Sequence, residues 1–434
     1  MTPRTIQIEE RVRLARALPL SVQHLCAMFG ATVLVPFLFK VDPATSLLMN
    51  GAGTLVYLAV TGGRIPAYLG SSFAFIAPVL AVLAAKGAGG YAAAQGAFIL
   101  FGLFFIAVAG VVRVAGTAWL DVVFPPAAMG AIVAVIGLEL APVATGMAGL
   151  TGTTVAGLGI PRHAAILVSV FTLAVTLLGS VLFRGFLAAI PVLIGVVSGY
   201  ALAAAVGIVD WRAVAAAPWF QVPALYAPAF DLHAALVIMP AFLVVLAEHI
   251  GHLVVTGNIV QRDLMRRPGL HRSLLGDGLS NVLSGLVGAT PNTTYGENIG
   301  VMAITRVFSV WVIGGAAVIA VLISFVGKLA ALVRSIPVPV MGGVSVLLFG
   351  VIAVAGIRML VEQKVDYTRS RNLMLSAVVL VAGVSGASVT IGTVALKGMA
   401  LGTVVAIALS LLLAVLDRWR LTNDEEHPAL PERA

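Results

Sequence analysis

The chain has 434 residues, of which 60% are hydrophobic and 10% are charged, and its mean hydropathy is +1.08. Soluble globular domains carry about 25% charged residues, so this composition excludes a soluble protein and indicates many membrane crossings. The net charge of +8 does not indicate nucleic-acid binding, because the basic residues lie between apolar runs. The single cysteine, Cys26, excludes an internal disulfide.

Apolar runs predict fourteen membrane spans, at roughly 20 residues per crossing. The expected spans are 18–41, 43–62, 67–85, 91–113, 117–142, 160–183, 185–209, 231–256, 271–290, 296–306, 307–334, 337–357, 370–388 and 395–417. The first run has no small-residue cleavage site and is interpreted as an uncleaved helix. No alternating pattern repeats as in an outer-membrane barrel, so we expect an all-α polytopic membrane protein.

The positions of the basic residues predict the orientation of the chain. With the N-terminus in the cytoplasm, nineteen of the 26 Lys and Arg residues fall on the cytoplasmic side, including those of the loop 257–270. We therefore expect both termini in the cytoplasm. The segment 210–230, with three Pro and two Trp, is expected at the external interface, and residues 418–434 form a cytoplasmic tail.

Three short matches indicate an internal repeat. The matching segments are 23–24 with 248–249, 68–72 with 294–298, and 124–130 with 336–342. They relate spans 1, 3 and 5 to spans 8, 10 and 12, which predicts two halves of seven spans. Because seven is odd, the second half is inverted in the membrane, and inverted repeats place substrate sites near the bilayer midplane.

The stretch 290–307, TPNTTYGENIGVMAITRV, interrupts the apolar pattern with polar residues, Pro and Gly. Such a break is tolerated at membrane depth only where it is buried in protein or lines a cavity. Glu297 is predicted near the N-terminus of a short helix, where backbone N–H groups are free. The segment 64–73, RIPAYLGSSF, is its counterpart in the first half, although its small residues are equally typical of helix packing.

Ionisable residues inside a bilayer are costly and are functional candidates. The candidates are His24, Asp121, Glu139, Glu248, His249, His252, Asp277 and Glu297. Glu248 and His252 are four residues apart and share a helix face, whereas His249 points about 100° away. Buried carboxylates and histidines form proton relays in transporters, so Glu248, His252 and Glu297 are our candidates for proton coupling.

Other interpretations of these residues stay open. Glu248 and His252 can form a structural hydrogen-bonded pair, and Glu297 can act as a helix cap. His249, His252 and Glu297 can hold a metal, but Glu-His-x-x-His is not the His-Glu-x-x-His metalloprotease order, so no metal is expected. For Asp277 and Asn281 we favour helix packing. Glu139 is either a gating group or a structural hydrogen-bonding group.

Residues 297–306, ENIGVMAITR, match a motif of Gln/Glu/Pro-Asn-x-Gly, four residues, then Thr. On this motif, with AEHIGH and GRIPAYLGSSFAF, the chain resembles the nucleobase–cation symporter-2 family, also called nucleobase–ascorbate transporters, and its bacterial uracil permease branch. The resemblance implies a core domain of spans 1–4 and 8–11 and a gate domain of spans 5–7 and 12–14. In residues, these are 18–114 and 231–334 for the core, and 115–230 and 335–417 for the gate.

The same resemblance implies short antiparallel strands in spans 3 and 10. It also implies that the side chains of Glu248 and Glu297 and the backbone amides of Phe73 and Gly296 bind uracil, with His252 supporting the site through water. Glu rather than Gln at 297 favours a pyrimidine. We also expect proton symport, no cofactor, and a homodimer formed through the gate domain.

This assignment agrees with the chemistry of the residues. Carboxylates accept hydrogen bonds from the N–H groups of uracil, amides at a helix start donate to its C=O groups, and Phe73 can pack on the ring. The alternatives are a permease for thymine or xanthine, a metal-dependent intramembrane hydrolase, and an anion channel or exchanger of related architecture.

Overall fold

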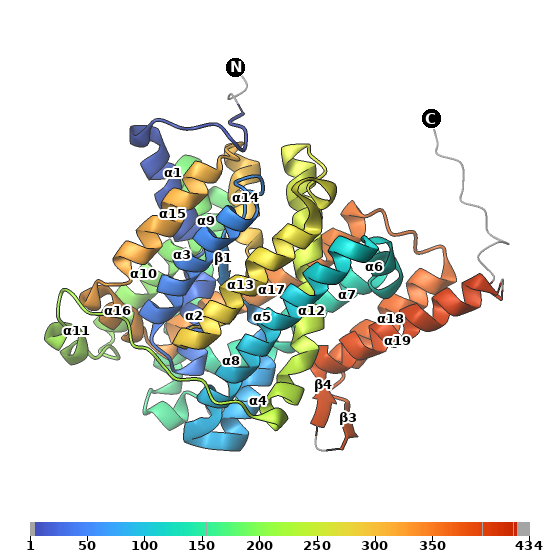
Figure 1. Cartoon of the computed structure of the whole chain (residues 1–434). Helices are drawn as coiled ribbons and strands as arrows, with labels where there is room; N and C mark the ends of the chain where they lie inside the picture. The colour runs from blue at the N-terminus through green and yellow to red at the C-terminus, as the bar shows by residue number, and fades with distance from the viewer. Residues whose placement is uncertain (1–4, 153, 393, 420, 423–434) are drawn as a thin grey trace.

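The computed structural model describes residues 5–152, 154–392, 394–419 and 421–422 and is mostly helical (Figure 1). Most of the expected cytoplasmic tail, residues 423–434, therefore lies outside the described residues. Within these described ranges, seven helical stretches are long and apolar enough to cross a membrane, namely 14–39, 73–115, 126–147, 162–182, 232–260, 338–362 and 398–418. Shorter apolar helices span 191–205, 310–323 and 370–384. The chain is thus an integral membrane protein with many crossings.

The elements follow the predicted order of spans. The first half contains α1 (Leu14–Ala27), α2 (Phe29–Phe39), α3 (Pro43–Val60), β1 (Leu69–Ser71), η1 (Phe73–Phe75), α4 (Ile76–Lys86), η2 (Gly87–Gly89), α5 (Gly90–Ala115), α6 (Ala118–Val123), α7 (Pro126–Glu139), α8 (Ala141–Met147), η3 (Ala156–Leu158), α9 (Arg162–Leu182), η4 (Gly185–Ala189), α10 (Pro191–Ala205) and α11 (Arg212–Ala216). The second half contains α12 (Leu232–Val260), η5 (Met265–Gly269), α13 (Leu270–Val287), β2 (Asn292–Thr294), α14 (Gly296–Thr305), α15 (Val310–Ile323), α16 (Gly327–Arg334), α17 (Val338–Glu362), α18 (Ser370–Val384), β3 (Ser388–Ile391), β4 (Val394–Lys397) and α19 (Gly398–Arg418).

The expected spans 117–142 and 307–334 are interrupted by non-helical backbone, whereas Met28 between α1 and α2 keeps a helical conformation. The prediction for 117–142 missed a break before α7, where Pro125 and Pro126 lack backbone donors and hold Phe124 outside the helical region. The prediction for 307–334 missed a break between α15 and α16. There the segment after α11 supplies hydrogen bonds, because the Gln221 N–H donates to the Phe325 carbonyl at 2.9 Å.

Two pairs of short strands form among the residues that the structure describes. β1 and β2 are antiparallel, with Leu69 opposite Thr294 and Ser71 opposite Asn292. The ladder is prolonged at both ends, where the N–H of Ser72 donates to Pro291 and that of Tyr295 donates to Tyr68. η1 and α14 therefore begin at opposite ends of one ladder.

β3 and β4 form a second antiparallel pair, with Ser388 opposite Lys397. The all-α prediction, with strands only in spans 3 and 10, did not include this hairpin. The sequence does indicate this hairpin, because the run SVTIGTVAL is rich in β-branched residues on both sides of Gly392. In the structure Gly392 has a φ of +62°, which suits a tight turn.

The helices pack in two groups. In the first group α13 packs against α3 and α5, and α15 packs against α1 and α3. In the second group α17 packs against α7 and α9, α18 against α7 and α19, and α9 against α10. α12 contacts both groups through α5 and α19.

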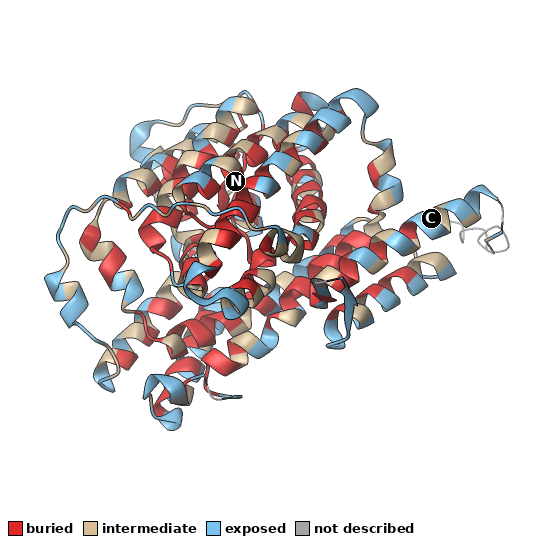
Figure 2. Cartoon of the chain, turned by 60° about the horizontal axis from the view of Figure 1, so that its bottom comes forward, coloured by how far each residue is buried: buried red, intermediate tan, exposed pale blue. Residues whose placement is uncertain are grey.

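Buried residues lie mainly along the inner sides of the helices, and exposed ones lie along the outer sides and loops (Figure 2). Outer helices expose large apolar side chains, including Leu178 and Val181 on α9 and Val381 on α18. Extended apolar surfaces of this kind are typical of contact with lipid.

Candidate functional site

Glu248 and His252 lie on the long helix α12, one turn apart and half-buried. α12 packs against η1, β2 and α14. This packing places the two side chains of α12 beside the strand ladder and the helices that start from it.

His252 connects α12 to the second broken segment. Its Nδ1 lies 3.1 Å from the hydroxyl of Thr294, the last residue of β2. Its Nε2 faces the start of α14, because a Cβ built on Gly296 would lie 3.3 Å from that nitrogen. One ring nitrogen is thus anchored to the strand, while the other lies beside the predicted ligand amide.

The start of α14 presents an exposed Gly296, followed by a half-buried Glu297 in the first turn. The first residues of a helix have N–H groups without intrahelical acceptors. Tyr295, just before the helix, is extended, and its hydroxyl donates to the Ser71 carbonyl at 3.0 Å. A Cβ on Gly70 would lie 2.3 Å from the Tyr295 ring, so glycine is required there.

Phe73 is the first residue of η1 and is buried, with 9% of its surface exposed. Its ring packs edge to face on Phe349 of α17, with centroids 5.9 Å apart. Phe73 therefore lies where the first helix group meets the second. All five predicted site residues lie on η1, α12 and α14, and α12 contacts the other two elements.

Prediction from sequence missed a buried polar network behind this site. Nδ1 of His249 lies 2.9 Å from Oδ2 of Asp277, and Nε2 lies 2.8 Å from the Ser273 hydroxyl. Asn281 donates to the other oxygen of Asp277 at 3.0 Å and also contacts both backbone groups of Asn292 in β2. The packing role favoured for Asp277 and Asn281 is therefore incomplete, since both form specific polar contacts.

The remaining ionisable candidates have structural partners. His24 on α1 contacts the Asn298 side chain through its Nδ1 and its carbonyl oxygen, both at 3.1 Å, and thereby holds α14. Glu139 accepts a hydrogen bond from the Met399 N–H at 2.8 Å at the start of α19. This contact is one that the structural interpretation of Glu139 expects.

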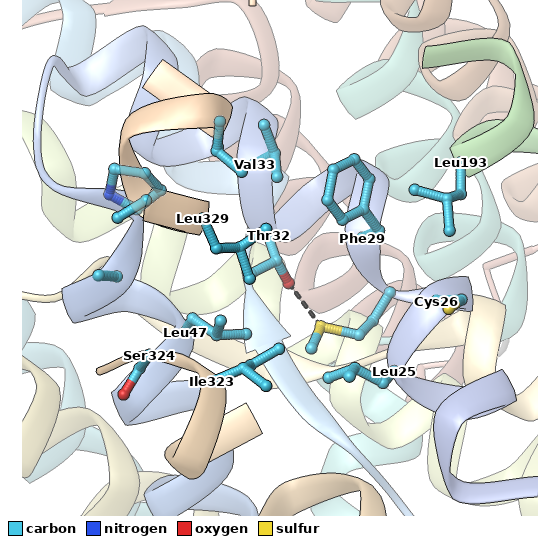
Figure 3. Close-up of a pocket in the computed structure, with 15 residues that line it drawn as sticks. Leu25, Cys26, Phe29, Thr32, Val33, Leu47, Leu193, Ile323, Ser324 and Leu329 are labelled. Carbon is cyan, nitrogen blue, oxygen red and sulfur yellow. Dashed lines mark hydrogen bonds between the residues drawn. The ribbon is translucent and has the colours of Figure 1, made fainter. Parts of the chain in front are cut away.

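An apolar cavity of about 220 Å³ lies elsewhere, among α1, α2, α3, α10, α15 and α16 (Figure 3). Its walls include Leu25, Phe29 and Leu193, and its Thr32 hydroxyl donates to the Met28 sulfur at 2.7 Å. None of the five predicted site residues lines it. Such walls offer few acceptors to the N–H groups of a polar heterocycle, so the cavity is not the candidate site.

Interrupted helices joined by a strand ladder, with carboxylates at the junction, are typical of membrane transporters. A model of the Permease family matches residues 15–392. The chain therefore belongs to this family of nucleobase–ascorbate transporters, and it is a transporter rather than an enzyme.

Several curated relatives of this chain are named uracil permease. The protein from Escherichia coli K12 is 62% identical over 96% of this chain and 95% of its own length. The protein from Paenibacillus larvae is 56% identical over 98% of this chain and its whole length. Murine solute carrier 26 member A9, an inward-facing anion transporter, is 13% identical with a TM-score of 0.68 over 94% of this chain and 69% of its own. This last likeness concerns the fold alone.

Proposed function

We propose that this protein imports uracil across the bacterial inner membrane by proton symport. The observation that carries the proposal is the convergence of Glu248 and His252 of α12 with the Glu297-bearing start of α14. Relatives named uracil permeases, similar over nearly their whole length, support the same substrate.

The site residues provide groups complementary to a pyrimidine. The carboxylates of Glu248 and Glu297 accept hydrogen bonds from ring N–H groups, and the amides of Phe73 and Gly296 donate to ring carbonyls. His252 holds the site from the side of the strand ladder, through Thr294 and a water. Glu248, His252 and Glu297 together bind the coupled proton.

Selectivity follows from the same contacts. A base whose N–H and C=O groups are placed differently leaves buried groups unpaired, which costs more than a poor apolar fit. A carboxylate at Glu297 accepts hydrogen bonds only, which favours uracil. Thymine or xanthine is the alternative substrate, and a panel of competing bases decides among them.

Alternating access arises from fourteen spans arranged as two inverted halves. An exchange of the two halves replaces α3 by α13 and α15 by α5, so the contact between α3 and α15 becomes the contact between α13 and α5. In the same way, the contact between α9 and α17 becomes the contact between α18 and α7. All four of these helix contacts are present. The core domain, residues 18–114 and 231–334, carries the site. It moves against the gate domain, residues 115–230 and 335–417, through which two copies form a homodimer. Both termini lie in the cytoplasm.

The test is uptake of radiolabelled uracil into cells and binding to the purified protein. We expect Glu248→Ala to abolish binding and Glu297→Gln to abolish or redirect it, whereas Glu362→Gln, at an exposed carboxylate paired with Arg358, leaves binding intact. A protonophore should stop accumulation. Binding of uracil by both site variants at the affinity of the parent protein would place the site elsewhere.

A further inference from the structure

A second pair of ionisable groups lies behind the candidate site and does not contact the proposed ligand groups. His249 and Asp277 are both fully buried, with 0% of each side chain exposed. Nδ1 of His249 is 2.9 Å from Oδ2 of Asp277, a distance at which a protonated imidazole and a carboxylate form an ion pair. An ionisable pair at this depth is expensive to bury and marks function.

The other sides of the imidazole are closed. The rings of Tyr57 and Phe105 pack edge-on against it, with centroids 6.4 and 5.8 Å away. Its Nε2 lies 2.8 Å from the Ser273 hydroxyl, which in turn lies 2.6 Å from the Tyr57 hydroxyl. The Ser273 hydroxyl therefore offers a hydrogen-bonded route by which a proton can reach His249.

A small cavity joins this chain to the candidate site. Its volume is about 10 Å³, and its lining includes His249, His252, Ser273, Thr294 and Tyr57. That is about the smallest volume that holds a water, and the polar side chains provide the two to four partners that a buried water needs. A water placed here lies between His252 and the His249–Asp277 pair.

Binding a base and a proton together requires two separate acceptors. Glu248 and Glu297 act as hydrogen-bond acceptors for the base, and a carboxylate accepts best when it is ionised. The titratable groups around His249 are Glu248 and His252 on α12, Tyr57 on α3, Asp277 on α13, and Glu297 on the adjoining α14. α5 contributes the uncharged Phe105.

We propose that His249 and Asp277 store the coupled proton while uracil is bound, an inference that rests on the proposed function. The proton passes from His252 to the cavity water and then to Ser273 Oγ, while the Ser273 hydroxyl proton moves to Nε2 of His249. The resulting imidazolium is balanced by the Asp277 carboxylate. Through Asn281, Asp277 is joined to β2, so the charge state of the pair reaches the strand that starts α14.

The experiment separates coupling from binding in proteoliposomes. Uracil counterflow measures exchange without a gradient, and accumulation under an inward proton gradient measures coupling. For Asp277→Asn we expect counterflow and Kd within about threefold of the parent, accumulation lowered at least tenfold, and a flattened pH profile of transport. Ser273→Ala, which cuts the proton path without removing a charge, should uncouple as well.

Ser280→Ala is the matched control. Ser280 lies on α13, as Ser273 and Asp277 do, and its substitution removes a hydrogen bond from Asn292 without a change at His249 or Asp277. It should keep coupling. Accumulation at the parent level by Asp277→Asn and Ser273→Ala, or a parallel loss of counterflow and accumulation, would overturn the inference. If Asp277→Asn does not fold, Ser273→Ala alone decides. A parent protein without uracil counterflow would instead refute the proposed function.

Discussion

Gly296→Ala is the substitution that tests the site most directly. The added methyl would lie 3.3 Å from Nε2 of His252, closer than the 3.4 Å at which ordinary contact begins. His252 is held on its other side, because its Nδ1 contacts Thr294 at 3.1 Å. The methyl therefore displaces the imidazole or fills space that the ligand needs.

The expected loss of affinity follows from the cost of overpacking. Such an insertion costs about 1–3 kcal/mol, which corresponds to a uracil Kd raised about 5- to 150-fold. The assay is isothermal titration with uracil on detergent-purified protein, together with a melting curve to show that the variant is folded.

Gly300→Ala provides the control on the same helix. A Cβ there meets nothing within 4 Å, so binding should be unchanged, and removing a helical glycine should stabilise α14 by about 0.5–1 kcal/mol. The placement of the site at the start of α14 is wrong if Gly296→Ala binds uracil like the parent, or if Gly300→Ala loses as much affinity.

Three further predictions concern stability. Glu139→Ala removes the acceptor of the Met399 N–H and should lower the free energy of unfolding by about 0.5–2 kcal/mol, measured as a lower Tm in detergent. Asn292→Ala removes buried hydrogen bonds that hold β2. Their loss should lower the free energy of unfolding by about 1–3 kcal/mol, measured as faster proteolysis than in the parent protein. The Arg262 guanidinium lowers the pKa of Glu9 below its ordinary 4.5, so their ion pair stabilises the protein above that pH and is lost as the pH falls through the lowered value. Because both side chains are largely exposed, Glu9→Gln should cost about 0.2–1 kcal/mol at pH 7 and low salt, and progressively less as the pH falls through the lowered pKa of Glu9; an equal Tm difference at neutral and acid pH would contradict this.

The sequence was most informative where local spacing determines geometry. Glu248 and His252 are four residues apart, so a helix places them on one face wherever it packs. The polar break around Glu297 could be found because no apolar span can be drawn through it. The division of 307–334 was not predicted, since its broken backbone is satisfied by a segment about 100 residues away.

The contact between His249 and Asp277 could not be found in this way. It depends on how closely α13 approaches its neighbours, and this is set by glycines that meet across helices. A Cβ on Gly278 would lie 2.7 Å from the Gly102 carbonyl on α5. Helical periodicity shows that His249 points away from Glu248, but it does not identify which small residues meet or what they bring together.

The ladder between β1 and β2 also constrains how the protein is made. Leu69 pairs with Thr294, so β1 emerges from the ribosome well over 200 residues before its partner. At roughly 5–20 residues per second, it waits on the order of 10–45 s with unpaired backbone groups. Since lipid cannot satisfy those groups, the first half must be held by water, the insertion machinery or non-native contacts until the second half arrives. The binding site therefore cannot be completed until α14 has been made, and a ribosome stalled between the two strands would leave it without β2 and Glu297.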